Sequence, residues 1–242
     1  LEVLLRWQHP HRGMLRPNYF LDVAEQTGLL NEIGEWALRK TCEEGLEIQA
    51  EAGIELQFAL NISSRQYSHP NLLNTVTNAL EETGFNPRHL ILEISESTLT
   101  TNSEQSRTTL QALSDMGLSL SIDSFGTGLS SLRQIKQIPI DIIKIDRSFV
   151  NGIPEDSSDM AIAETLLSVA TQMDLKTFAT GVETRKQEAF LKIHGCRYAQ
   201  GYLYSPPLPF KQLKKLLHSI QSGETIHAGS QIYLPFTAKN HP

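Results

Sequence analysis

The stretch Leu118–Val150, which reads LSLSIDSFGTGLSSLRQIKQIPIDIIKIDRSFV, decides the fold of this chain. Its first part, Leu118–Ile122, alternates apolar and polar residues as a half-buried β-strand does. This run ends on Asp123, and the glycine-bearing turn Ser124–Gly128 follows at once. The pattern predicts a strand that delivers a carboxylate to the point where the chain turns.

A second apolar run, Ile140–Ile143, follows a short helical stretch and ends on Lys144 and Asp146. Side chains alternate between the faces of a strand, so Lys144 points opposite to its neighbours Ile143 and Ile145. A lysine on the buried side of a strand usually has a charged partner or a chemical role. Two strands therefore end on charged groups, which is how α/β proteins place chemistry at one edge of a sheet.

The rest of the chain alternates strands and helices in the same way. Further strands are predicted at Leu1–Trp7, already in progress at the first residue, and at Leu56–Ile62, Leu90–Ile94, Leu175–Ala179 and Tyr198–Tyr204. Helices are predicted at Tyr19–Gln26, Leu29–Ala52, Leu72–Leu80, Ser103–Met116, Ser158–Met173, Lys186–Ile193 and Phe210–Ile220. About seven βα units favour a (β/α) barrel, with a doubly wound open sheet as the structural alternative.

The length and composition of the chain limit the domain sizes, binding partners and cellular environments that it suits. The 242 residues suit one large α/β barrel or two small domains, and 40% hydrophobic residues allow a substantial core. We expect Trp7, Trp36 and the phenylalanines to belong to that core. The formal charge of −6 argues against general binding of nucleic acids or membrane surfaces. Two cysteines form no disulfide framework, and no apolar run is long enough to span a bilayer, so we expect a reducing cytoplasm.

Polar residues recur where the predicted strands end, and the carboxyl ends of barrel strands gather on one face. The residues concerned are Glu2, Asn61, Glu93, Asp123, Lys144, Asp146, Glu183 and Gln200. The oxygen-bearing side chains of Glu2, Asn61, Glu93 and Asp123 suit a hard cation such as Mg²⁺ or Mn²⁺. The competing interpretation is structural, because a single acidic residue at a strand end is more often a cap or a solvated charge.

Several motifs together resemble the EAL domain family, bacterial enzymes that hydrolyse cyclic di-GMP. The resemblance covers Glu2 to about Pro209. Its motifs are EVLLRW at Glu2–Trp7, NIS at Asn61–Ser63, LEISES at Leu92–Ser97, SFGTG at Ser124–Gly128, KID at Lys144–Asp146, GVET at Gly181–Thr184 and QGYL at Gln200–Leu203. No single motif is specific for this family, but the combination of motifs is.

The resemblance implies an α/β, TIM-like (β/α)8 barrel whose N-terminal strands are partly missing from this chain. It implies metal ligation by Glu2, Asn61, Glu93 and Asp123, with one Mg²⁺ or Mn²⁺ site expected and a second doubtful. Catalytic roles would fall to Lys144 and Glu183, and Glu96 would brace the glycine turn. Substrate contacts would come from Leu4, Arg6, Asp146, Gln200 and Pro207. The reaction would be attack of metal-activated water on one phosphodiester, giving linear pGpG.

Two positions depart from the family pattern. Ser124 stands where the family has a second aspartate before its FGTG, and Thr180 replaces the glutamate of AEGVET. Both missing carboxylates belong to the second metal and its water. A hydroxyl adds no charge, and affinity for a hard divalent cation follows ligand charge.

These departures lead to three functional hypotheses. The first is a degenerate EAL domain that binds cyclic di-GMP as a signalling receptor with little or no hydrolysis. The alternatives are an active, metal-dependent cyclic di-GMP phosphodiesterase, and a protein-interaction module that binds no nucleotide. Substrate binding and turnover are separable, because only groups that act on the transition state raise kcat.

The resemblance also leads to expectations about organisation. We expect an EAL-type barrel over residues 1–221 and an irregular tail over 222–242. By analogy we expect a homodimer, a further signalling domain N-terminal to this chain, no nucleic-acid partner, no membrane contact by this domain and a bacterial cytoplasmic location.

Overall fold

The computed structural model describes residues 1–101, 104–128 and 132–221, so the predicted tail at 222–242 lies outside the described residues. The chain divides into two compact units. Unit 1 comprises Leu1–Ile94 and Asn102–Leu118, and unit 2 comprises Ser95–Thr101 and the chain from Ser119 onwards. Each unit has its own parallel strands and its own helices, and each is described by itself below.

The strands of unit 1 are parallel neighbours in the order β1 (Glu2–Val3), β4 (Phe58–Ile62) and β5 (Leu90–Ser95). Glu2 lies opposite Ala59, and Asn61 lies opposite Glu93. Strand β5 is almost wholly buried, as a strand covered on both faces should be. The register places polar residues of adjacent strands side by side at the carboxyl ends.

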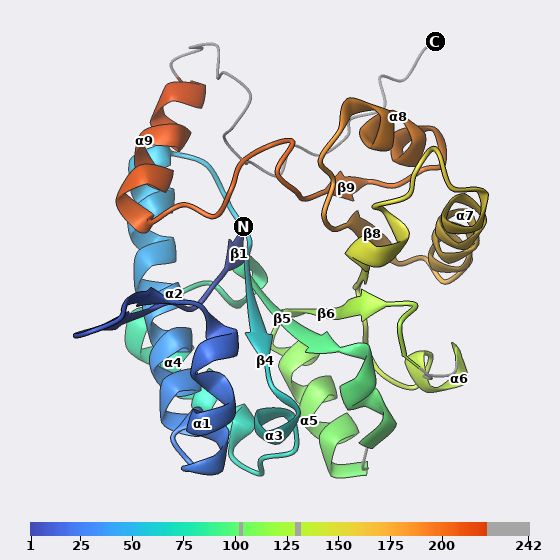
Figure 1. Cartoon of the computed structure of the whole chain (residues 1–242). Helices are drawn as coiled ribbons and strands as arrows, with labels where there is room; N and C mark the ends of the chain where they lie inside the picture. The colour runs from blue at the N-terminus through green and yellow to red at the C-terminus, as the bar shows by residue number, and fades with distance from the viewer. Residues whose placement is uncertain (102–103, 129–131, 222–242) are drawn as a thin grey trace. The chain divides into compact units, whose positions relative to one another are not determined.

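Unit 1 also contains helices. They are α1 (Leu21–Gln26), α2 (Leu30–Ala52), α3 (Ser64–Tyr67), α4 (Leu72–Thr83) and α5 (Glu104–Asp115), with 3₁₀ turns η1 (Pro17–Tyr19) and η2 (Pro87–His89). Helix α2 packs on strand β4, and helices α2 and α4 pack side by side (Figure 1). Helix α2 buries residues at helical spacing, including Leu38, Cys42 and Ile48, and ends at Gly53, whose φ of 57° only glycine adopts readily.

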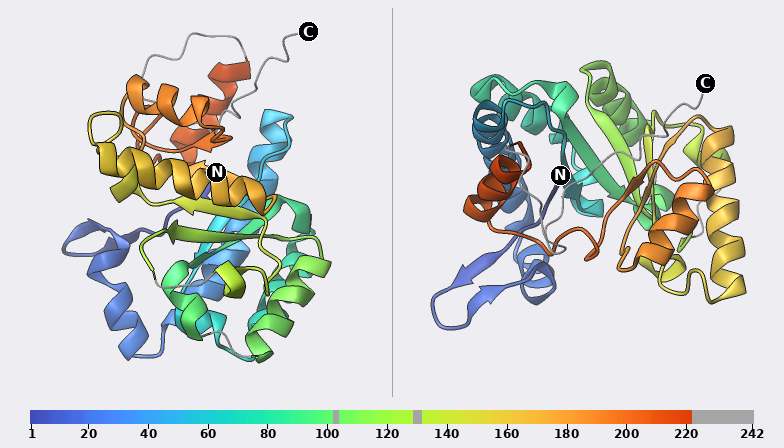
Figure 2. Two further views of the ribbon diagram at one scale, coloured as in Figure 1. Left: turned by 90° about the vertical axis from the view of Figure 1, so that its right-hand side faces the viewer. Right: turned by 90° about the horizontal axis from the view of Figure 1, so that it is seen from above.

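Unit 2 contains four parallel strands in the order β6 (Ser119–Phe125), β7 (Ile142–Ile145), β8 (Lys176–Ala179) and β9 (Tyr198–Ala199). Its helices are α6 (Leu132–Ile135), α7 (Ser157–Gln172), α8 (Arg185–Ile193) and α9 (Phe210–Gln221), with 3₁₀ turns η3 (Glu96–Thr101) and η4 (Arg147–Phe149). Helix α7 packs on β7 and β8 (Figure 2). The fully buried Ile145, Val150, Ala163 and Leu191 belong to one apolar cluster that holds these elements together.

The sequence predicted most of these elements to within a few residues, and the alternation of parallel strands with helices confirms the α/β class. Three predictions were wrong. The opening strand is interrupted, because β1 ends at Val3 and an antiparallel hairpin of β2 (Trp7–His9) and β3 (Gly13–Leu15) follows. Strand β9 stops at Ala199 instead of Tyr204, because Gln200, Gly201 and Leu203 turn the backbone against Val182.

The third error concerns the tryptophans, which do not lie in the core. Trp7 is 45% exposed and Trp36 is 56% exposed. The Trp7 ring meets Phe20 edge-on in the hairpin region, with ring centroids 5.8 Å apart. A two-stranded hairpin has too few neighbours to enclose a ring of this size, so the indole stays half in solvent. In the part of the chain that the structure describes, no helix has the length and apolarity to cross a bilayer.

Candidate active site

Three of the four predicted metal ligands come together in unit 1. Asn61 Nδ2 donates a hydrogen bond to Glu2 Oε1 at 3.0 Å, and Asn61 is the register partner of Glu93 on the adjacent strand. Glu93 is only 3% exposed, so its carboxylate is withdrawn from bulk water. Two carboxylates and one amide thus lie on three neighbouring strands. Oxygen ligands of this kind are the ones that hard divalent cations prefer.

The fourth predicted ligand, Asp123, belongs to unit 2. Within the described ranges, no group of three or more His, Cys, Asp or Glu side chains is placed to hold a metal ion. The unit 1 set contains two such residues, Glu2 and Glu93, and Asn61 supplies the third oxygen. Metal ligation by all four residues therefore stays a prediction.

Asp123 and Ser124 occupy an irregularity near the carboxyl end of β6. The pairing of β6 with β7 shifts register between Ile122 and Phe125, which is the signature of a β-bulge. Ser124 has a φ of 55°, a left-handed conformation that asparagine and aspartate tolerate better than serine. Bulges of this kind redirect side chains, and here the bulge sets the directions of Asp123 and Ser124.

Lys144 is a buried cation in unit 2. It is 3% exposed, and its Nζ lies 3.6 Å from Asp123 Oδ1 across adjacent strands. A buried ammonium needs a nearby anion to offset its lost hydration, and Asp123 supplies that charge. The sequence predicted both residues, and the bulge explains how they meet.

Asp146 follows β7 and caps the 3₁₀ turn η4. Its Oδ1 accepts a hydrogen bond from the Ser148 backbone N–H at 2.8 Å. Burial by itself would raise the pKa of Asp146, but hydrogen bonds from Ser148, Ser124 and the Arg147 backbone outweigh it. The pKa therefore lies below its ordinary value, and the carboxylate is charged at neutral pH.

The two hydroxyls at the family's carboxylate positions are both engaged by the protein. Thr180 Oγ1 donates to the Ile145 carbonyl at 2.9 Å, which joins the ends of β7 and β8. Ser124 Oγ lies 3.5 Å from Asp123 Oδ2 and also hydrogen-bonds Asp146. Each hydroxyl thus has a structural partner, and neither adds negative charge.

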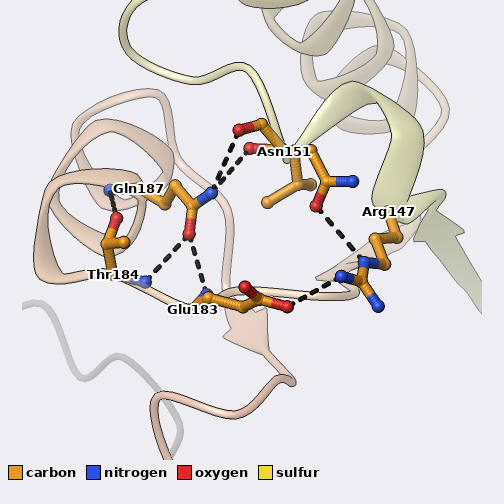
Figure 3. Close-up of polar contacts among 6 residues, drawn as sticks. Arg147, Asn151, Glu183, Thr184 and Gln187 are labelled. Carbon is orange, nitrogen blue, oxygen red and sulfur yellow. Dashed lines mark hydrogen bonds and ion pairs between the residues drawn. The ribbon is translucent and has the colours of Figure 1, made fainter.

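Glu183 pairs with an arginine that the sequence analysis did not single out (Figure 3). Arg147 Nη2 donates to Glu183 Oε1 at 2.8 Å, and Arg147 Nε donates to Asn151 Oδ1 at 3.3 Å. Gln187 holds the adjacent backbone. Residues Thr184 and Gln187 carry the spacing of a helix capping box, which is the one sequence signal that could have pointed to this cluster.

Glu96 contacts the glycine turn. Its Oε2 accepts hydrogen bonds from the Gly126 N–H at 2.8 Å and the Gly128 N–H at 3.0 Å. Glu96 is 3% exposed, and a Cβ at Gly128 would crowd its carboxyl group. The geometry is that of a brace, and a role of this brace in catalysis stays a prediction.

The predicted substrate contacts occupy less constrained positions. Leu4 is 39% exposed, and the Arg6 guanidinium donates to the Leu5 carbonyl at 2.7 Å. Gln200 follows β9, where its carbonyl accepts from the Val182 N–H at 2.9 Å. Pro207 is exposed in the loop before α9. The contacts of these residues with a nucleotide stay predictions.

Comparison with known proteins adds three kinds of finding. A family model described as EAL domain matches residues 1–207. The bifunctional diguanylate cyclase/cyclic di-GMP phosphodiesterase MucR of Pseudomonas aeruginosa is 42% identical over 214 residues, which are 88% of this chain and 31% of MucR. The cyclic di-GMP phosphodiesterase NbdA of the same organism is 39% identical over 90% of this chain and 28% of NbdA. The chain thus spans about a third of these relatives.

Solved structures agree with the fold. The MucR phosphodiesterase in complex with c-di-GMP superimposes with a TM-score of 0.83 at 42% identity, covering 88% of this chain and 86% of that structure. The FimX EAL domain of Pseudomonas aeruginosa bound to c-di-GMP gives a TM-score of 0.77 at 27% identity, covering 86% and 84%. These likenesses confirm the predicted TIM-like α/β fold class.

Proposed function

Because the chain belongs to the EAL domain family, we propose that it binds cyclic di-GMP and hydrolyses one of its phosphodiester bonds to linear pGpG. Two close relatives are named as cyclic di-GMP phosphodiesterases, and one of them is solved in complex with c-di-GMP. These names support hydrolysis better than the receptor role that the sequence analysis placed first. The observation that carries the proposal is the buried Lys144 beside Asp123 in a chain that matches the family over residues 1–207.

By their chemistry, the predicted oxygen ligands suit a Mg²⁺ or Mn²⁺ ion. The Asn61 amide nitrogen is turned toward Glu2, which leaves the amide oxygen as the ligand atom, and Glu93 lies beside it on the next strand. Asp123 would complete the set with a third carboxylate. When bound, such a metal lowers the pKa of a coordinated water and offsets phosphate charge.

The residues of unit 2 then have separate roles. In the reaction, a water molecule gives up a proton and its oxygen forms a bond to phosphorus as the opposite P–O bond breaks. The departing oxygen gains a proton, so one proton is lost and one is taken up. Lys144 would hold its ammonium at the phosphate or the attacking water, oriented by Asp123. Glu183 would orient the water, and Asp146 would keep a negative charge near these groups. Contacts with the nucleotide would come from Gln200 and Pro207 of unit 2 and from Leu4 and Arg6 of unit 1.

A second candidate, a cyclic di-GMP receptor with little or no hydrolysis, is favoured by one observation. The Ser124 and Thr180 hydroxyls occupy the family's carboxylate positions and are held by protein hydrogen bonds. Two negative charges are therefore missing from the surroundings of a second cation. Binding could persist without them, because ground-state binding and transition-state stabilisation are separable.

The distinguishing experiment restores the missing charges. We expect the double variant Ser124→Asp/Thr180→Glu to raise kcat with Mg²⁺ or Mn²⁺ about 10- to 100-fold, the range typical for groups that support a metal site. The measurement is steady-state conversion of cyclic di-GMP to pGpG, with calorimetric titration of the nucleotide in Ca²⁺ for binding. The matched control is Thr165→Glu/Ser168→Asp, which adds the same charges on the exposed face of α7.

The outcomes separate the three functions. Many turnovers by the unmodified chain support the phosphodiesterase. The receptor is favoured if the unmodified chain binds the nucleotide without turnover, and if the double variant, but not its control, gains turnover. Absence of binding heat in Ca²⁺, together with absence of turnover in Mg²⁺ and Mn²⁺, would reject both and favour an interaction module that needs no nucleotide.

A further inference from the structure

The carboxamide of Gln187 joins two loops of unit 2 that lie far apart in sequence. One loop follows β7 and contains Asp146 and Arg147, and the other follows β8 and contains Glu183. Gln187 stands in the first turn of α8 and is 5% exposed. A polar group buried this deeply is stable only when its hydrogen bonds are made.

The oxygen end of this side chain holds the backbone of Glu183 and Thr184. Gln187 Oε1 accepts from the Glu183 N–H at 2.8 Å and from the Thr184 N–H at 2.9 Å. In return, Thr184 Oγ1 accepts from the Gln187 N–H at 3.2 Å, which completes a capping box. This half of the arrangement fixes the backbone from which the Glu183 carboxylate projects.

The nitrogen end reaches the other loop. Gln187 Nε2 donates to the Val150 carbonyl at 3.0 Å and lies 3.5 Å from the Asn151 carbonyl (Figure 3). A capping box can contain either glutamate or glutamine at this position. Glutamate at this site would place a charged oxygen against the Val150 carbonyl and lose the donor. The chemistry of the second loop therefore selects glutamine.

The side chain of Glu183 is tied to the same loop by Arg147. The Arg147–Glu183 ion pair is 2.8 Å long, but its side chains are 58% and 41% exposed. An ion pair this exposed is weak by itself and is screened by salt. Gly181 has a φ of 76°, and a Cβ there would overlap the Arg147 side chain that crosses it. Close packing and the buried amide, more than the ion pair, keep Glu183 in place.

We propose that Gln187 is a positioning residue for Glu183. It sets the Glu183–Thr184 backbone against the Val150–Asn151 backbone, so that the loops following β7 and β8 keep one spacing. Its effect on turnover rests on the proposed phosphodiesterase function, whereas its effect on the two loops does not.

The test compares Gln187→Met with Gln187→Glu. Methionine keeps the volume and loses both ends of the carboxamide, whereas glutamate keeps the acceptor for Glu183 and Thr184. In the ligand-free protein we expect Gln187→Met to speed hydrogen exchange at the Glu183 and Thr184 amides about tenfold or more. In Gln187→Glu, hydrogen exchange at these two amides should be slower than in Gln187→Met. The control Gln172→Met, on the exposed end of α7, should leave the exchange rates of both amides unchanged.

The kinetic arm uses the same variants. We expect Gln187→Met to lower kcat for cyclic di-GMP about 10- to 100-fold while KM stays within about twofold, because misplaced groups act on the transition state. A purely structural role would instead speed exchange throughout unit 2. If Gln187→Met unfolds the unit, hydrogen exchange in the unmodified protein still tests the proposal. The proposal requires slow exchange at the amides of Glu183 and Thr184, although both residues precede α8.

Unchanged exchange at Glu183 and Thr184 in Gln187→Met, or acceleration spread evenly over a unit 2 that remains folded, would overturn the positioning role. Failure of the unmodified chain to produce pGpG would instead reject hydrolysis, and the exchange comparison would still decide the role of Gln187.

Discussion

Among single residues, Asp146 has the most distinctive electrostatics. Its carboxylate caps η4 and receives hydrogen bonds that lower its pKa despite partial burial. These bonds favour the charged form in the folded protein only. The stability that these hydrogen bonds provide is fully present above pH 3.8, which is the ordinary pKa of an aspartate. It is lost as the pH falls through the lower pKa of the folded state.

We therefore expect Asp146→Asn to flatten the acid limb of the stability curve. Asparagine caps a helix about as well as aspartate, so the free energy of unfolding at pH 7 should change by less than about 1 kcal/mol. The measurement is urea unfolding of both proteins between pH 7 and pH 3. Parallel loss of stability in the two proteins would show that Asp146 does not contribute to the acid dependence.

At the scale of elements, the turn after β6 depends on Glu96. One carboxylate oxygen accepts hydrogen bonds from the N–H groups of Gly126 and Gly128. That carboxylate belongs to η3, which contacts β6. Gly126 has a φ of 98°, and a Cβ there would crowd Phe149 and Leu166. Backbone shape and one buried carboxylate together hold the turn that follows Asp123.

We expect Glu96→Ala to destabilise the protein by about 1–3 kcal/mol, because two partly buried N–H groups lose their acceptor. Hydrogen exchange at Gly126 and Gly128 should accelerate with it. The matched control is Glu155→Ala, which removes an exposed ion pair with Lys186 and should cost about 0–1 kcal/mol. Equal losses in the two variants would contradict a bracing role.

At the scale of the whole molecule, each unit contains one free cysteine that reports on its integrity. Cys42 lies in unit 1 and Cys196 in unit 2, and both are buried. Burial raises the pKa of each thiol to about 11. Since the thiolate is the reactive form, both thiols should be inert while the units stay folded.

We expect a thiol-specific reagent at pH 8 to label neither cysteine in the folded protein and both in denaturant. Mass spectrometry of labelled peptides follows the two units separately as urea is raised. Rapid labelling of either cysteine without denaturant would show that its unit opens readily in water.

Most helices and strands could be located from the sequence because local periodicity of apolar residues indicates them. The helical spacing in α2 and the apolar run of β5 are properties of neighbouring residues. The exposed Trp7 and Trp36 were misjudged for the complementary reason, since a large apolar residue reveals nothing about whether other elements cover it. Similarly, β9 ended early because the Val182 backbone, distant in sequence, takes over the hydrogen bonds of the next residues.

The amino-acid sequence by itself determined the α/β alternation, the polar residues at the strand ends and the family, because motif spacing and periodicity are written in the chain. Only the tertiary structure decided that Lys144 meets Asp123, that Thr180 is bound to the Ile145 carbonyl and that Gln187 joins the two loops around Glu183. These contacts join residues 21 to 37 positions apart. Such pairs depend on strand register, a bulge and burial, which arise when the elements pack together.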